Sequence, residues 1–155
     1  MYACKNGHYE IVKHLIDHHA DINVVSKFGL TALLCACEGG NDKVVELLLK
    51  NNSVINRKGK HGETEFIQGC KSNNFQIVKH LIQYNADVNI TDNAGNTGLM
   101  FASENGNYEM VQYLIHCGAN VTCCNDFGYP ALTFACKNNN VEVAELLIRH
   151  GANVN

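Results

Sequence analysis

The sequence predicts an all-α solenoid, in which short helix–turn–helix units stack along one direction. Three observations lead to this prediction. Glycine recurs at Gly29, Gly62, Gly95 and Gly128, always at an interval of 33 residues. Threonine, leucine and small residues follow each glycine at nearly fixed offsets, and an apolar helical pattern closes each unit. A constant period along a whole chain is the signature of a repeat architecture.

Each 33-residue repeat begins with its turn glycine, and a helix N-cap residue follows two positions later. That residue is Thr31, Thr64 or Thr97, with Pro130 at the equivalent place in the last unit. A threonine hydroxyl can accept a hydrogen bond from a free backbone N–H of the first helical turn. A short helix follows, for example Leu33–Glu38, and Gly or Asn residues end it because they tolerate left-handed backbone.

The second helix of each unit spans about nine residues, with apolar positions at i, i+1, i+4 and i+5. Val44, Val45, Leu48 and Leu49 show this pattern. Neither helix is long enough to be stable alone in water, so the units must stack on one continuous core. Extended, β-hairpin-like turns then lead to the next glycine. The predicted ends of the second helices are His19, Asn52, Asn85, Gly118 and Gly151.

With this period and these motifs, the chain resembles the ankyrin-repeat family over its full length. Thr31, Leu33 and Ala36 match the family's Thr-Pro-Leu-His-x-Ala pattern, whereas Ala32 and Leu34 replace its Pro and His. Neither end looks like a polar capping repeat, so we expect the chain to be an excerpt of a longer array. The resemblance implies one domain over 1–155, with repeats 1–28 (incomplete), 29–61, 62–94, 95–127 and 128–155 (incomplete).

Charge and composition exclude several classes of protein. The net charge of −3 provides no global basic field for nucleic acid. No apolar run approaches the ~20 residues of a membrane helix, and the first residues are not a signal peptide. We therefore expect an intracellular, cytoplasmic protein that binds no nucleic acid and inserts into no membrane. The eight cysteines fit reduced thiols, and four share one small-residue position: Cys4, Cys37, Cys70 and Cys136.

We predict that the chain is not an enzyme and carries no cofactor. It contains no nucleophile elbow, no phosphate loop and no carboxylate pair placed by a cleft. His14 and His18 have the i, i+4 spacing of metal ligands, and Cys123 lies beside Cys124. A structural or solvent-exposed role is favoured for both pairs, but a metal- or redox-sensing segment stays open as a third hypothesis.

Asparagines near the ends of the turns resemble those of the family. They are Asn23, Asn56, Asn89 and Asn155. In some animal ankyrin proteins such asparagines are hydroxylated. The favoured interpretation is that their side chains brace the turn through hydrogen bonds to the backbone.

The resemblance also implies where a partner would bind, namely a concave face made by the turn tips and the inner sides of the first helices. Aromatic residues lie near both ends of this face and a basic turn (residues 57–61, beginning at Arg57) lies between them, a pattern typical of binding hot spots. The alternative is that Phe28 and Phe127 pack onto the adjoining turn. The candidate residues are Lys27, Phe28, Leu30, Lys58, Lys60, His61, Lys71, Glu104, Phe127, Tyr129 and Lys137.

The main functional hypothesis is a non-catalytic module that binds a protein partner of unknown identity on this face. The alternative is a structural spacer or scaffold segment within a larger, multidomain ankyrin protein. The uncapped terminal repeats also suggest end-to-end self-association, because exposed apolar faces drive contacts.

Overall fold

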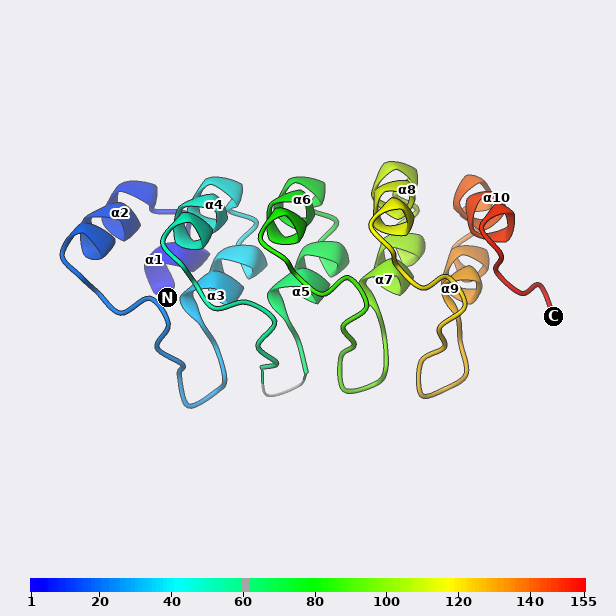
Figure 1. The fold of residues 1–155 in the computed structure, drawn as a ribbon, viewed down its shortest axis with the longest axis horizontal. Coiled ribbons are helices and arrows are strands. Elements are labelled where there is room, and N and C mark those ends of the chain that lie inside the picture. Colours follow the sequence, from blue (N-terminus) through cyan, green and yellow to red (C-terminus); the bar gives the residue numbers. More distant parts are fainter. Residues whose placement is uncertain (60–61) are drawn as a thin grey trace. The chain divides into compact units, whose positions relative to one another are not determined.

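The computed structural model describes residues 1–59 and 62–155. Contacts between Cα atoms divide the chain into two compact units, Met1–Asp87 (unit 1) and Val88–Asn155 (unit 2). Each unit repeats one arrangement of a short helix, a tight connection, a longer antiparallel helix and an extended turn (Figure 1). Each unit is described by itself below.

Unit 1 has two layers of helices. The short first helices α1, α3 and α5 form one layer and the longer second helices α2, α4 and α6 form the other, with the turns projecting beyond the first layer (Figure 1). Stacking contacts join α1 to α3, α3 to α5 and α4 to α6. The bounds are α1 (Tyr2–Lys5), α2 (Tyr9–Asp17), α3 (Ala32–Glu38), α4 (Asp42–Lys50), α5 (Glu65–Lys71) and α6 (Phe75–Gln83).

Unit 2 repeats the pattern with α7 (Gly98–Glu104), α8 (Tyr108–His116), α9 (Ala131–Lys137) and α10 (Val141–Arg149). Within the described residues, β-structure is limited to two isolated antiparallel bridges, Thr91 with Thr97 and Cys124 with Pro130. Both bridges close the base of a turn. The predicted all-α fold of helix–turn–helix units with hairpin-like turns is therefore confirmed.

The helix ends lie where the sequence predicts them. The hydroxyls of Thr31, Thr64 and Thr97 accept hydrogen bonds from the third residue of their helices, at 3.0, 3.2 and 3.4 Å. The proline that replaces them in the last repeat has no such hydroxyl, and α9 has no side-chain cap. The second helices end in left-handed backbone at His19, Asn52, Asn85, Gly118 and Gly151.

The core of each unit lies between the two helix layers. The four apolar positions of α4, Val44, Val45, Leu48 and Leu49, are all buried. The shared cysteine position behaves differently along the chain, since it is buried at Cys4, Cys37 and Cys70 but exposed at Cys136. Cys136 lies on α9, the final helix of the short-helix layer in unit 2. It is exposed because no further short helix of unit 2 packs over it.

Candidate functional site

The first aromatic turn tip, at residues 26–30 of unit 1, is held by its own serine. Ser26 Oγ accepts hydrogen bonds from the backbone N–H groups of Phe28 and Leu30, at 3.2 and 3.1 Å. These bonds fix the backbone of the tip. Phe28 therefore projects into solvent with 57% of its surface exposed, while Leu30 is half-buried behind it.

The equivalent tip in unit 2, at residues 125–129, is held in the same way by an asparagine. Asn125 Oδ1 accepts from the N–H groups of Phe127 and Tyr129, at 3.1 and 2.9 Å. Asn125 Nδ2 also donates to Asn96 Oδ1 of the preceding turn at 2.8 Å. Phe127 and Tyr129 are 70% and 52% exposed. Packing onto an adjoining turn, the alternative weighed for these aromatic rings, therefore covers less than half of either Phe28 or Phe127.

Charged residues of alternating sign end the first helices. Lys5, Glu38, Lys71, Glu104 and Lys137 occupy equivalent positions 33 residues apart. Lys5 Nζ and Glu38 Oε2 form an ion pair at 3.1 Å. Lys71 and Lys137 are exposed and Glu104 is half-buried. The inner side of each unit thus carries both signs of charge.

The predicted basic turn is only partly described. Arg57 and Lys58 are exposed. Lys60 and His61 lie outside the described residues, so their role in binding stays a prediction. Gly59 stands where the other turns have Ser26, Asp92 and Asn125, and it offers no side-chain oxygen to brace this turn.

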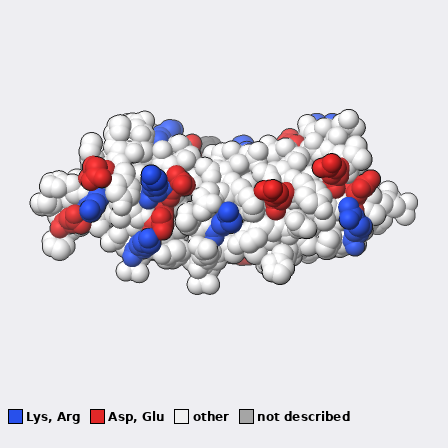
Figure 2. Space-filling model, turned by 90° about the horizontal axis from the view of Figure 1, so that it is seen from above, with Lys and Arg blue, Asp and Glu red and all other residues white. Residues whose placement is uncertain are grey.

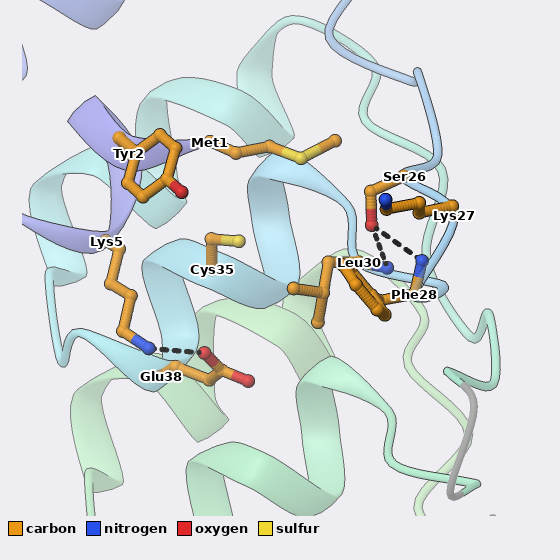
Figure 3. A pocket seen from close by; sticks show the side chains of 9 residues that line it. All are labelled: Met1, Tyr2, Lys5, Ser26, Lys27, Phe28, Leu30, Cys35 and Glu38. Atoms are coloured by element: carbon orange, nitrogen blue, oxygen red, sulfur yellow. Dashed lines mark hydrogen bonds and ion pairs between the residues drawn. The ribbon is translucent and has the colours of Figure 1, made fainter.

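A hollow of about 330 Å³ opens behind the first aromatic tip (Figure 3). Three of the predicted binding residues, Lys27, Phe28 and Leu30, line it. The predicted binding residues did not include Tyr2 and Cys35, which also line it. The alignment of the repeats contains one indication of this hollow, namely the small residue at position 35. Cys35 is the smallest residue at a position that elsewhere holds Tyr2, Gln68, Phe101 and Phe134.

One carboxylate is buried in the stack of unit 1. Glu65 begins α5 and is 1% exposed. Thr31 Oγ1 donates to its Oε1 at 3.4 Å, whereas its Oε2 has no hydrogen-bond partner among the described residues. Burial raises the pKa of Glu65 from 4.5 to about 6, and hydrogen bonds and the Arg57 charge oppose this shift. Burial likewise raises the pKa values of the Cys37 and Cys70 thiols, which therefore stay protonated.

The turn asparagines join neighbouring repeats. Asn23 Oδ1 accepts from the N–H of Val54 at 2.8 Å, and Asn23 Nδ2 donates to the carbonyl of Asn52 at 3.4 Å. Asn56 and Asn89 form the same pair of bonds one and two repeats later. Bracing through backbone hydrogen bonds is thus confirmed for these three residues, with partners in the next repeat. Their hydroxylation is not tested by these contacts.

The histidine and cysteine pairs of the third hypothesis lie at the surface or partly buried. The rings of His14 and His18 are tilted by 41° with centroids 4.1 Å apart, and His18 Nδ1 lies 2.8 Å from the carbonyl oxygen of His14. Cys123 is half-buried and Cys124 is exposed. Among the described residues, no three His, Cys, Asp or Glu side chains gather as a metal site requires. All eight cysteines lie in the described part of the chain, and none of them forms a disulfide there.

The second-helix face offers less for recognition. Figure 2 looks onto this face and shows acidic and basic side chains interspersed along it. Two of its pairs are i, i+4 ion pairs, Lys50 with Glu46 at 2.7 Å and Arg149 with Glu145 at 3.8 Å. Such exposed pairs contribute little free energy and are typical of a solvated surface.

Comparison with known families agrees with this architecture. A family model described as ankyrin repeats (3 copies) matches residues 1–92 and 66–155. The chain belongs to the ankyrin-repeat family. Ankyrin repeats are generally protein–protein interaction modules and generally non-catalytic. A search of curated proteins found no match for the chain. Among the described residues of this ankyrin-repeat chain, no helix is long and apolar enough to cross a membrane.

Proposed function

We propose that the chain is a non-catalytic module that binds a protein partner through its turn tips and the inner sides of its first helices, without a cofactor. The exposure of Phe28, Phe127 and Tyr129 on braced turns carries this proposal. Large aromatic side chains held in one conformation lose little entropy on binding and supply much of the energy of protein interfaces. The eight cysteines form no disulfide among the described residues, which favours a reducing cytoplasm as the place of binding.

Charged residues on the same side would set the register and speed of association rather than the bulk of the affinity. Arg57 and Lys58 are exposed beside helix ends that alternate in sign. A partner segment with acidic residues between apolar anchors would complement the basic turn. We therefore expect affinity to fall as salt is raised.

The test begins with capture of a partner by the full chain, identification by cross-linking, and titration of the purified partner. Phe127→Ala and Tyr129→Ala should each weaken binding by about 1–2 kcal/mol or more. Lys58→Glu should reduce affinity mainly at low salt. Lys43→Glu on α4 is the matched control, since it changes an exposed lysine on the opposite layer.

The alternative function, a structural spacer or scaffold segment, predicts a different result. If the chain is a spacer, no partner will be found whose affinity depends on the turn-tip residues. Binding that survives Phe127→Ala, Tyr129→Ala and Lys58→Glu, with helical circular dichroism unchanged, would contradict the interaction proposal.

Self-association of the 155-residue chain is a second candidate, favoured by the outer face of α2. Ile11 and Leu15 are 53% and 48% exposed, whereas the equivalent Val44 and Leu48 are buried. Another copy could cover this apolar face. Light scattering over a concentration series should show mass above that of a monomer, and Leu15→Glu should restore the monomer. A monomer at every concentration would reject this candidate.

A further inference from the structure

The hollow behind the first turn tip is a place where the repeat pattern is incomplete. Its wall lies between α1, the 26–30 turn and α3 (Figure 3). The inner position of α3 is occupied by Cys35, where later repeats carry Gln68, Phe101 and Phe134. A thiol fills much less space than a glutamine or phenylalanine side chain. The small Cys35 side chain therefore leaves space at the inner side of α3, and it lines a cavity of about 330 Å³ in unit 1.

The lining of the hollow is mainly apolar. Phe28 and Tyr2 stand at the rim and are 57% and 88% exposed, and Leu30 and Cys35 form the deeper wall. Ser26 Oγ, the nearby polar group, already accepts two backbone hydrogen bonds and holds the turn. An apolar side chain entering the hollow would thus be in contact with rings and aliphatic groups without leaving this hydroxyl unpaired.

The charges around the hollow are unequal. Lys5 and Glu38 neutralise each other through their 3.1 Å ion pair (Figure 3). Lys27 Nζ instead lies 5.3 Å from the centroid of the Phe28 ring and forms no ion pair within the described part of the chain. The uncompensated charge at the rim is therefore positive, which complements a carboxylate on the ligand.

The equivalent place in unit 2 has the opposite properties. Asp126 replaces Lys27, and Phe134 replaces Cys35 at the inner helix position. The aromatic tip is kept, since Phe127 is equivalent to Phe28. Unit 2 thus provides a natural control, with the same turn and aromatic ring but an acidic rim and a larger inner side chain.

We propose that the hollow bounded by Tyr2, Phe28, Leu30 and Cys35 receives one large apolar side chain of a protein partner, with an acidic residue of the same segment beside Lys27. The proposal rests on the interaction function above and names the chemistry of the segment recognised. A segment of the form Leu, Met or Phe with Asp or Glu within one helical turn fits these features.

The experiment uses a random dodecapeptide library displayed on phage and selected against the intact chain at low salt. Enriched sequences should pair a large apolar residue with a nearby acidic residue. A synthetic peptide of the enriched sequence is then titrated by fluorescence anisotropy against four variants. Phe28→Ala and Cys35→Phe, which narrows the hollow with the side chain used elsewhere in the repeats, should each lower affinity about tenfold or more.

Lys27→Glu should lower affinity several-fold at low salt and much less at high salt, because screening removes a charge effect. Lys43→Glu, the fourth variant, changes an exposed lysine of α4 on the opposite layer and should leave affinity unchanged. Phe28 is largely exposed, so its variant keeps the test valid if Cys35→Phe perturbs folding.

Several outcomes would overturn the proposal. Selection of no peptide, or only of basic or wholly polar ones, would do so, as would affinity unaffected by Phe28→Ala and Cys35→Phe. Peptides that lose binding only with Lys43→Glu would reject the hollow as their site while leaving the interaction function intact. The interaction function itself is tested separately, by titrating the purified native partner against the turn-tip variants.

Discussion

The third repeat (62–94) and the fourth repeat (95–127) have the same local architecture built from different side chains. Their first helices, α5 and α7, each span seven residues and begin after a threonine cap. The side chains at three equivalent positions differ, however. Glu65, Gly69 and Asn89 of the third repeat correspond to Gly98, Ala102 and Thr122 of the fourth. The caps and turn glycines therefore determine the repeat backbone, while other equivalent positions vary and change its stability.

The most costly difference is the buried carboxylate of the third repeat. At the equivalent positions the other repeats have Ala32, Gly98 and Ala131, which bury no polar group. The pKa of Glu65 is raised to about 6 by burial, above the usual 4.5. Its charged form is thus disfavoured in the folded state. Stability from this group is fully present below about pH 4.5 and is lost as the pH rises through 6.

The largest expected effect follows from removing this charge. Glu65→Gln should stabilise the chain by about 2 kcal/mol near pH 8, and by little near pH 4, because the amide does not ionise. Urea unfolding at both pH values measures the difference. Glu10→Gln on the exposed side of α2 controls for the loss of an acidic residue. Equal destabilisation at both pH values would instead mean that the carboxylate stabilises the stack through its bond to Thr31.

The sequence predicted most of the fold because the repeat depends on local chemistry. The period and the threonine caps locate the first helices, and the second helices end at the predicted His, Asn and Gly residues. The hollow was not predicted, since it requires the positions of α1 and the 26–30 turn around Cys35. The burial of Glu65 was also missed, although its place at the family's Pro position was visible in the sequence.

The asparagine bridges show the same limit. Their bracing role was predicted from residue type, but their partners lie in the next repeat and become visible only when repeats are stacked. At Thr122 the bridge is absent from the described contacts. Its N–H and hydroxyl instead donate to Asn120 Oδ1, at 3.0 and 2.9 Å.

Restoring the bridge should remove this difference between the third and fourth repeats. Thr122→Asn would place an amide where it can reach the carbonyl of Gly151 and the N–H of Asn153, the equivalents of the partners of Asn89. We expect a gain of about 1 kcal/mol in the free energy of unfolding. Asn89→Thr should cause a comparable loss. If Thr122→Asn has no effect while Asn89→Thr destabilises, the last turn does not allow the geometry of the bridge.

The smallest expected effect concerns Gly69, which lies inside α5 where other repeats have Ala36, Ala102 and Ala135. Alanine is favoured over glycine in a helix by about 0.5–1 kcal/mol. A Cβ at this position would lie 3.2 Å from a methyl of Val78 and 3.3 Å from a methyl of Ile77, so both side chains must move slightly.

In the second repeat, the equivalents of Gly69, Ile77 and Val78 are Ala36, Val44 and Val45, and all three are buried. We therefore expect Gly69→Ala to raise the free energy of unfolding by less than about 1 kcal/mol. The denaturant midpoint should rise accordingly, with an unchanged m value. The reciprocal Ala102→Gly in α7 should lower it. A lower midpoint for Gly69→Ala would show that α6 packs directly against the bare backbone of α5. The third repeat would then differ from the fourth in helix spacing as well as in side chains.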